Sequence, residues 1–274
     1  MGNSVPIKIT IGAYARLRVN TDKGSFSMKN RRSFLAFAVA ATLSAATLAH
    51  AQETVVVGVV TVAPPFSYVD GTTMTGISND ILQRVAEIEN FTIDYVPLKF
   101  DALIPSIQAG QIDIAVSGIF VTEERKRVVD FSDPYHIQGA ILVAPHDSDI
   151  NGVEDLQGKR LAAEQGSAPL NIANANAEEW GVTIRIFPDA ANMQLAMRTG
   201  DVDAMIYDSG IVAYQLQVEG DNPTIKMISD PIQPTGIAFA FPKGSEWVEV
   251  VNHGMATMEA NGEISAIKQK YDMN

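Results

Sequence analysis

The 274-residue chain contains no cysteine, which excludes disulfide bonds, thiolate metal sites and a thiol nucleophile. It is also poor in positive charge, since 20 Lys and Arg stand against 32 Asp and Glu for a formal net charge of −12. A chain this acidic repels nucleic acid and anionic lipid. We expect no nucleic-acid partner, no metal ion and no cofactor.

The first 51 residues have the composition of an export signal. A basic segment at 28–32 precedes an Ala-rich apolar segment at 34–48 and the small-x-small motif at 49–51. The apolar segment is too short and too weakly hydrophobic for a membrane span, so we expect cleavage after Ala51 and no direct membrane insertion. Residues 1–27 are predicted to be an upstream mis-start, with Met28 as the initiator. The paired Arg31 and Arg32 leave Sec and twin-arginine export both open.

Strand and helix patterns alternate along the rest of the chain, which predicts an α/β fold with parallel sheets. Expected strands are 54–62, 92–96, 112–116, 140–144, 160–163, 183–187, 204–207 and 236–241. Expected helices begin near 78, cover 101–109, follow 168, cover 191–198 and 210–216, and close the chain as a pair.

An internal echo suggests two like units with two like sheets. Helix, glycine, apolar residue, aspartate and strand follow one another at 104–117 and again at 194–207, with Asp113 and Asp203 at matching places. Strand ends of two such sheets would meet at a shared crevice. We interpret the two aspartates as turn caps rather than as a catalytic pair.

Arg125 lies near the start of a predicted helix. Thr122 is a good N-cap, and Glu123 and Glu124 suit the positive end of the helix dipole, whereas a cation there is mildly unfavourable. The guanidinium beside free backbone N–H groups would bind a carboxylate or a phosphate. The alternative is a surface arginine paired with a neighbouring acid, and this pattern leaves both open.

The segment GIFVTEERKRVVDFSDPY at 118–135 resembles the signature of the family 3 extracellular solute-binding proteins, the polar amino-acid receptors of ABC importers. The resemblance covers about 54–271. It implies the two-lobed type II periplasmic-binding-protein fold, in which each lobe is a mostly parallel sheet flanked by helices and two hinge strands join the lobes. Lobe 1 would comprise 52–138 and 235–274, and lobe 2 139–234, with hinge strands near 135–140 and 233–237.

The resemblance also implies roles for single residues. Arg125 would hold the ligand's carboxylate together with N–H groups near Phe120, and Gly118 would offer backbone contacts. Asp208 would take the ligand's amino group from the other lobe, although from the local pattern alone it is a helix N-cap. Ser167 and Ala168 lie in the loop whose N–H groups would meet the carboxylate at a helix start.

Three positions depart from the family pattern. Phe120 replaces a common Ser or Thr, Ala63 replaces an aromatic lid, and Val60 replaces an acid. Phe120 with Phe66 and Phe100 resembles the aromatic box of the ectoine-binding branch, where rings face a cation. The alternative is that one or two of these rings are ordinary core.

The predicted function is a periplasmic binding protein, without catalytic residues, that captures a small amino acid or amino-acid-like zwitterion by hinge closure. It would act as a monomer and deliver its ligand to an inner-membrane ABC permease, free in the periplasm of a Gram-negative cell. The first alternative is a dehydratase or lyase of the cyclohexadienyl dehydratase kind, with Glu164 as its acid. Glu164 also suits a ligand with a second positive charge. A sensor module is the second alternative.

Overall fold

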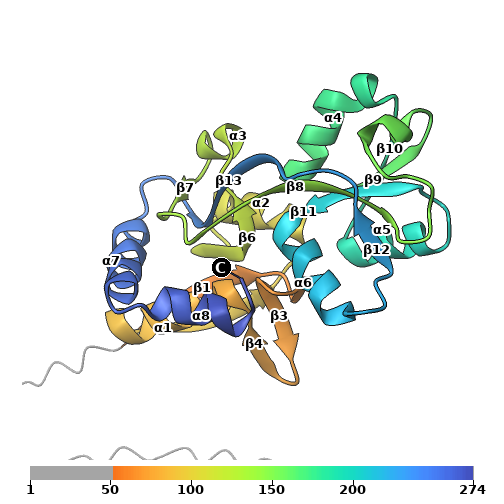
Figure 1. Cartoon of the computed structure of the whole chain (residues 1–274). Helices are drawn as coiled ribbons and strands as arrows, with labels where there is room; N and C mark the ends of the chain where they lie inside the picture. Colours follow the sequence, from red (N-terminus) through yellow and green to blue (C-terminus); the bar gives the residue numbers. More distant parts are fainter. Residues whose placement is uncertain (1–51, 274) are drawn as a thin grey trace, which may run out of the picture. The chain divides into compact units, whose positions relative to one another are not determined.

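The computed structural model describes residues 52–273 (Figure 1). The predicted mis-start at 1–27 and signal peptide at 28–51 lie outside the described residues. Within the described part, no helix is both long enough and apolar enough to cross a membrane.

Three parallel strands form one part of the sheet: β1 (Glu53–Val59) lies between β5 (Phe91–Pro97) and β6 (Ile114–Phe120). Every residue of β6 is buried, as expected for a central parallel strand covered on both faces. The flanking helices are η1 (Phe100–Ala102), α1 (Ile77–Glu89), α2 (Leu103–Gln108), α3 (Glu123–Lys126), α7 (Trp247–Ala260) and α8 (Glu263–Lys270). We call these strands and helices the β1 side; its α1, α7 and α8 lie at the left of Figure 1.

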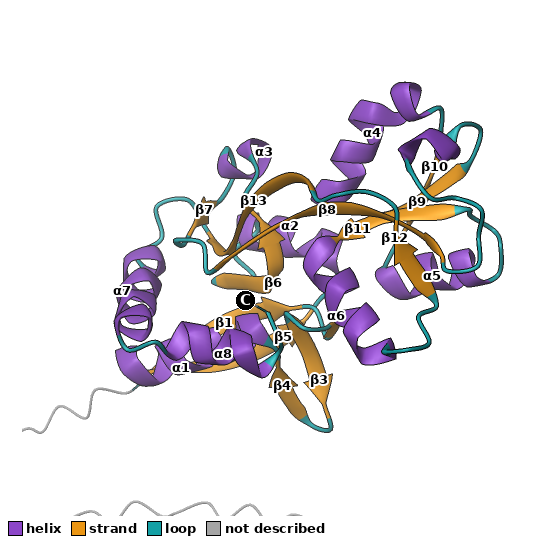
Figure 2. Ribbon diagram, in the orientation of Figure 1, coloured by secondary structure: helices purple, strands orange, loops and turns teal. Residues whose placement is uncertain are grey.

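A second set of parallel strands has β9 (Arg160–Glu164) between β10 (Thr183–Phe187) and β11 (Ala204–Asp208). Its helices are η2 (Val153–Leu156), α4 (Ala168–Trp180), α5 (Ala190–Arg198) and α6 (Ser209–Glu219). We call this group the β9 side; it occupies the right of Figure 2.

Two long strands connect these sides. β8 (His136–Pro145) and β13 (Ile232–Phe241) pair antiparallel, with Thr235 opposite Gln138 and Gly236 opposite Ile137. β8 continues beside β11, and β13 beside β6, so that the path β10-β9-β11-β8-β13-β6-β1-β5 is continuous. The short strands β7 (Asp130–Phe131) and β12 (Ile225–Met227) pair with β13 and β8. Both segments predicted as hinge strands therefore overlap paired strands.

The α/β prediction is confirmed, with mostly parallel neighbours on each side and helices flanking them. The two predicted sheets correspond to two groups of parallel strands, which β8 and β13 hydrogen-bond into one ten-stranded sheet. The sequence also did not indicate the small sheet of β2 (Val62–Ala63), β3 (Ser67–Asp70) and β4 (Thr73–Thr75). Strands this short carry no clear alternation of polar and apolar residues.

Asp113 and Asp203, the aspartates at matching places in the two like units, make the same kind of hydrogen bond. Asp113 Oδ2 accepts a hydrogen bond from the backbone N–H of Val56 at 2.8 Å, and Asp203 Oδ2 accepts one from that of Arg160 at 2.8 Å. Each carboxylate thus joins the start of its own strand to a neighbouring parallel strand. The two aspartates therefore bridge neighbouring strands rather than cap their own turns, and the repeated pattern marks equivalent places on the two sides.

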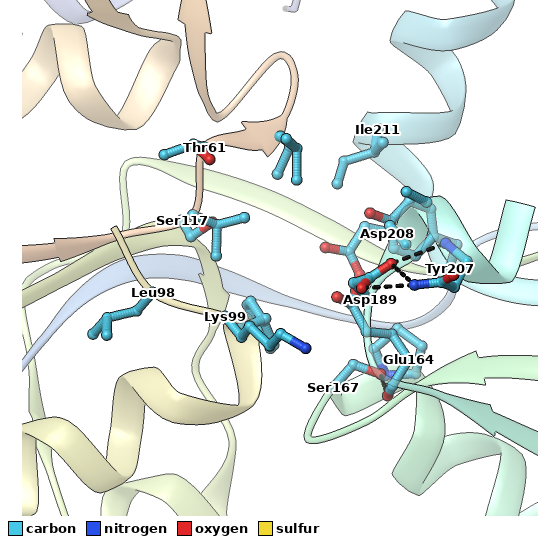
Figure 3. A pocket seen from close by; sticks show the side chains of 18 of the residues that line it. Thr61, Leu98, Lys99, Ser117, Glu164, Ser167, Asp189, Tyr207, Asp208 and Ile211 are labelled. Carbon is cyan, nitrogen blue, oxygen red and sulfur yellow. Dashed lines mark hydrogen bonds between the residues drawn. The ribbon is translucent and has the colours of Figure 1, made fainter. Parts of the chain in front are cut away.

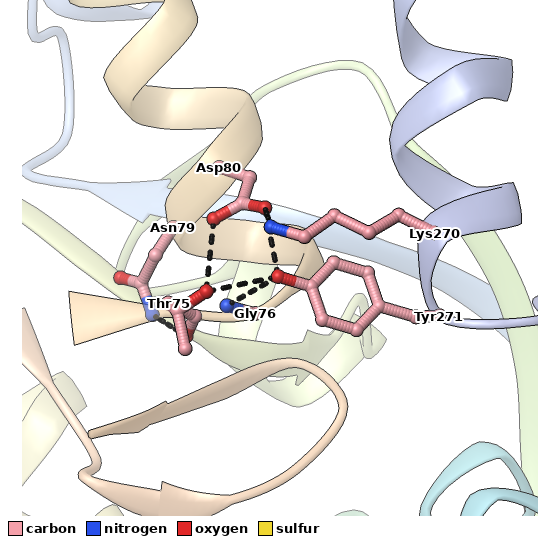
Figure 4. A network of polar contacts seen from close by, with 6 residues as sticks. All are labelled: Thr75, Gly76, Asn79, Asp80, Lys270 and Tyr271. Carbon is pink, nitrogen blue, oxygen red and sulfur yellow. Dashed lines mark hydrogen bonds and ion pairs between the residues drawn. The ribbon is translucent and has the colours of Figure 1, made fainter. Parts of the chain in front are cut away.

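A polar network fastens the C-terminal helix to the β1 side (Figure 4). The hydroxyl of Tyr271, directly after α8, accepts a hydrogen bond from the Gly76 N–H at 3.0 Å and donates one to Asp80 at 2.7 Å. It also lies 3.0 Å from the Thr75 hydroxyl. Lys270 completes the network with an ion pair to Asp80 at 2.7 Å. The start of α1 and the end of α8 are thereby held together.

Candidate functional site

A cavity of about 510 Å³ lies between the β1 side and the β9 side, where strand ends from both approach each other (Figure 3). This is the edge at which open α/β sheets bind ligands. Its lining from the β1 side is Val60, Thr61, Val62, Ala63, Pro97, Leu98, Lys99, Phe100, Ser117 and Phe120. Its lining from the β9 side is Glu164, Ser167, Ala168, Pro169, Asp189, Ala190, Ala191, Asn192, Tyr207, Asp208 and Ile211.

Five of the eight predicted ligand-binding residues line this cavity. They are Phe100, Phe120, Ser167, Ala168 and Asp208. The structure brings them together from four separate stretches of the chain. The other three predicted residues lie elsewhere.

Phe66 and Gly118 pack against each other behind the cavity lining. Phe66 is fully buried, with its ring centroid 5.8 Å from that of His136. Gly118 has φ of +63°, and a Cβ at this position would lie 3.0 Å from Cγ of Phe66. This close approach in a left-handed conformation requires glycine. The structure does not bring Phe66 to the cavity, so only Phe100 and Phe120 of the expected aromatic box face it.

Arg125 begins as the sequence predicts and then makes contacts that the sequence did not indicate. Thr122 caps the helix by accepting a hydrogen bond from the Arg125 N–H at 3.2 Å. The guanidinium is only 9% exposed and donates to the carbonyl of Phe120 at 2.9 Å and to that of Gly166 at 3.0 Å. Since Gly166 belongs to the β9 side, Arg125 joins the two sides.

Electrostatics at Arg125 favour an anion. Burial lowers the pKa of Arg125 to about 10, while the nearby carboxylates of Asp208 and Glu124 raise it. The guanidinium therefore stays charged at neutral pH. Because α3 is a single four-residue turn, its dipole adds little, and the guanidinium itself supplies the positive charge.

Arg125 does not line the 510 Å³ cavity but a smaller neighbouring one of about 300 Å³. Phe100 lines both cavities, and the Arg125 Cζ lies 5.4 Å from the centroid of its ring. Two of the five guanidinium N–H donors are used on the carbonyls of Phe120 and Gly166. Further donors are thus available beside the wall that the two cavities share.

Asp208 ends β11 and occupies the N-cap position of α6, yet its side chain accepts no capping hydrogen bond from that helix. The residue is 8% exposed and lines the cavity. Burial raises the pKa of Asp208 to about 7, against the lowering effect of Arg125. The interpretation as a helix cap lacks the hydrogen bond that defines one, and the carboxylate faces the cavity instead.

Ser167 caps α4 at the cavity wall. Its hydroxyl accepts a hydrogen bond from the Leu170 N–H at 3.1 Å and donates one to the Glu164 carbonyl at 2.8 Å. The hydroxyl is thereby engaged in the local turn. The first turn of α4 contributes Ala168 and Pro169 to the lining, so a 13-residue helix begins at the cavity.

The lining residues Ser117 and Asp189 were not predicted from the sequence, and Glu164 was predicted as the acid of the dehydratase alternative or as a partner for a second positive charge. Ser117 has a buried hydroxyl oxygen with no hydrogen-bond partner among the described residues. Asp189 caps α5 by accepting from the Asn192 N–H at 2.9 Å. Glu164, which ends β9, is 9% exposed. The sequence feature that could have indicated Glu164 and Asp189 is their position, since each ends or closely follows a strand of the parallel group, where open α/β sheets bind ligands.

The charges of the lining are arranged unevenly. Figure 3 shows Glu164, Asp189 and Asp208 together on one side of the cavity, with Leu98 and Lys99 on the other. Among the lining residues only Lys99 is cationic, against these three carboxylates. Such a lining favours a ligand that carries positive charge, next to the faces of Phe100 and Phe120.

Comparisons with known proteins agree with this arrangement. The model of the bacterial extracellular solute-binding proteins, family 3, matches residues 55–274. The arginine-binding extracellular protein ArtP of Bacillus subtilis is 27% identical over 76% of this chain and 81% of its own length. The L-cystine-binding protein TcyJ of Escherichia coli is 28% identical over 80% and 82%. An ancestral arginine-binding protein solved with arginine superimposes with a TM-score of 0.75 at 28% identity, covering 81% of this chain and 99% of that one.

Proposed function

This chain belongs to the bacterial extracellular solute-binding proteins of family 3, and from that premise we propose that it captures a small amino acid or amino-acid-like zwitterion for an ABC importer. The bound ligand is delivered to an inner-membrane permease. The protein acts as a monomer in the periplasm after its export signal has been removed. These roles rest on family membership and on the predicted signal at 28–51.

The observation that carries the proposal is the placement of two buried opposite charges at two neighbouring cavities that share Phe100 as a wall. Asp208 faces the cavity from the β9 side without a capping partner, and Arg125 lies behind Phe100 on the β1 side. A zwitterion satisfies both, with its ammonium at Asp208 and its carboxylate at Arg125. Leaving either charge buried without a partner is costly, so each favours a ligand of this class.

Capture proceeds by closure of two lobes, bounded as 52–138 with 235–274 and as 139–234. β8 and β13 are the strands that bend, because they alone among the long strands continue from one side to the other. Ligand contacts from both lobes favour the closed form, since the second set of contacts forms only on closure. The Arg125 hydrogen bond to the Gly166 carbonyl is a direct contact between the two lobes that also depends on their approach.

The aromatic lining narrows the ligand class. Phe120 stands where the family commonly has a hydroxyl, and its ring faces the cavity together with that of Phe100. Each cation–π contact contributes roughly 0.5–2 kcal/mol once desolvated. Cyclic, guanidino and N-alkylated amino acids should therefore bind more tightly than serine, aspartate or glutamate.

The test is a thermal-shift screen of the mature protein against these groups, with mass spectrometry of small molecules released by denaturation. A ligand that binds only the folded state raises the melting temperature. We expect cationic or cyclic amino acids to raise the melting temperature. Absence of stabilisation by any amino acid, with no co-purifying amine, would contradict it.

One observation favours the dehydratase or lyase alternative. Glu164 is a buried carboxyl in the cavity, and burial with its acidic neighbours raises its pKa to about 8, so it holds a proton at neutral pH and suits a general acid. Incubation with prephenate-like and arogenate-like acids tests this. Turnover by the parent protein that is lost in Glu164→Gln would establish an enzyme. If the parent does not convert these acids, the binding function stands.

A further inference from the structure

Glu164 has a buried carboxyl group in the cavity with few hydrogen-bond partners among the described residues. It ends β9, is 9% exposed and lines the cavity. The backbone N–H of Ala190 lies close enough to lower the pKa of the Glu164 carboxyl group. A carboxylate accepts about four hydrogen bonds, so most of its capacity is directed toward the cavity.

The two neighbouring acidic residues of the lining, Asp189 and Asp208, do not have the same free acceptor capacity. Both oxygens of Asp189 are held by the side-chain amide of Asn192 at 2.8 Å, in addition to the α5 cap. Asp208 is engaged by the ligand's ammonium in the proposed function. Glu164 is therefore the remaining buried carboxylate of the lining with free acceptor capacity.

The surroundings of Glu164 make an added cation favourable. Asp208, Asp189 and Asp101 lie close enough to repel its charge, whereas the Ala190 N–H favours it. Burial raises the pKa of the Tyr207 phenol on β11, and the nearby negative charges of Glu164 and Asp208 raise it further. The lysine of the lining, Lys99, is an exposed residue and lies on the opposite side of the cavity in Figure 3.

We propose that Glu164 is a specificity-determining residue that binds a second cationic group on the ligand, so that the preferred ligand is an amino acid with a positively charged side chain. The inference rests on the proposed function, in which Asp208 takes the α-ammonium group. Two carboxylates then meet two cations of one ligand. The cavity volume of about 510 Å³ is within the range of small-molecule pockets and holds an amino acid of arginine size.

Titration calorimetry with matched ligand pairs tests the inference. Arginine is compared with citrulline, and lysine with norleucine, because the members of each pair differ mainly in side-chain charge. The parent protein should prefer the charged member at least tenfold in at least one pair. Glu164→Gln should reduce that preference to threefold or less, mainly through weaker binding of the charged member.

The control is Glu178→Gln, which removes an exposed carboxylate from α4 without touching the cavity. It should keep the parent's preference. Equal binding of charged and neutral members by the parent, or an unchanged preference in Glu164→Gln, would overturn the inference while the proposed function stands. If no amino acid binds the parent at all, the proposed function itself fails.

Proton release provides a second readout. Since Glu164 holds its proton at neutral pH in the ligand-free site, pairing with a cation should expel it. Calorimetry of the preferred ligand at pH 7 in phosphate and in Tris, whose ionisation enthalpies differ, measures the released protons. The parent should release more protons than Glu164→Gln, and equal release would count against a direct pairing with Glu164.

Discussion

At the scale of single residues, the site depends on charges that burial has made costly. Arg125 and Asp208 are each less than one-tenth exposed, and each shifts the pKa of the other toward the charged state. Neither forms a direct ion pair in the described part of the chain; Arg125 contacts two carbonyls instead. A ligand that bridges both charges relieves two desolvation penalties at once.

Arg125→Ala should weaken binding of the preferred amino acid by about 2–5 kcal/mol, because it removes the positively charged partner of the ligand's buried carboxylate. The informative comparison is arginine against agmatine, which lacks the carboxylate. The parent should prefer arginine, and the variant should bind both alike. Arg185→Ala, on the exposed face of β10, serves as the control. Calorimetry in which Arg125→Ala keeps the preference for arginine would remove Arg125 from carboxylate recognition.

Glu164 should also make stability depend on pH. Its pKa is raised from 4.5 to about 8, so the folded state binds the proton more tightly than the unfolded chain. The contribution is fully present below pH 4.5 and is lost as the pH rises toward 8. Asp208, raised from 3.8 to about 7, acts in the same direction at lower pH.

Glu164→Gln should therefore gain stability over the ligand-free parent as the pH is raised from 5 to 8, by roughly 2–4 kcal/mol at the upper end. Urea unfolding at a series of pH values measures the difference. Glu178→Gln should follow the parent throughout. A difference that does not grow with pH would mean that Glu164 is not desolvated in the folded protein.

At the scale of the elements, the C-terminal helix depends on one tyrosine. The Tyr271 hydroxyl contacts Thr75, Gly76 and Asp80, which belong to β4, the turn after it and α1. The residue is 4% exposed, so water does not readily replace these partners. α8 otherwise buries only Ile264 among its own residues, which makes the Tyr271 network its main polar anchor.

Tyr271→Phe should lower the free energy of unfolding by about 1–3 kcal/mol, because it leaves the buried Gly76 N–H without its acceptor and removes one of the two hydrogen bonds to Asp80 Oδ2. Thermal or urea unfolding measures this. The control is Tyr95→Phe, since the Tyr95 hydroxyl has no hydrogen bond within residues 52–273 that would be lost. Equal stability of the two variants would show that the network in Figure 4 contributes little.

At the scale of the whole molecule, side-chain hydrogen bonds among the described residues bridge the two sides in addition to the paired strands β8 and β13. On the rim of the site, Glu124 of α3 accepts a hydrogen bond from the Asn171 side-chain amide of α4 at 2.9 Å. The Arg125 contact with Gly166 lies beside it. Contacts of this kind exist only when the sides are close, so they stabilise a closed form.

Asn171→Ala should weaken ligand binding about two- to tenfold, because an exposed hydrogen bond to a carboxylate contributes on the order of 0.5–1.5 kcal/mol. Small-angle scattering should show less ligand-induced compaction at subsaturating ligand. Asn176→Ala removes an amide of the same helix that bonds only to the Ile172 carbonyl, and it should behave like the parent. If both variants bind alike, the Glu124 contact does not stabilise closure.

The sequence by itself determined the features that depend on neighbours along the chain. Periodicity located the helices and most strands, Thr122 was predicted as an N-cap from turn chemistry, and Asp113 and Asp203 were found at matching places of two like units. These are decided by contacts within a few residues, or by a pattern that repeats. The family signature at 118–135 has the same local character.

Only the tertiary structure decided which side chains share the cavity. Phe66 and Phe120 are both buried phenylalanines, yet one packs behind Gly118 and the other faces the cavity. Glu164 is a buried residue of the cavity lining because β9 lies beside β11, and Asp208 and Asp189 lie near its carboxyl group. Burial and the distance between charges depend on the packing of segments far apart in the chain, and no local pattern encodes them.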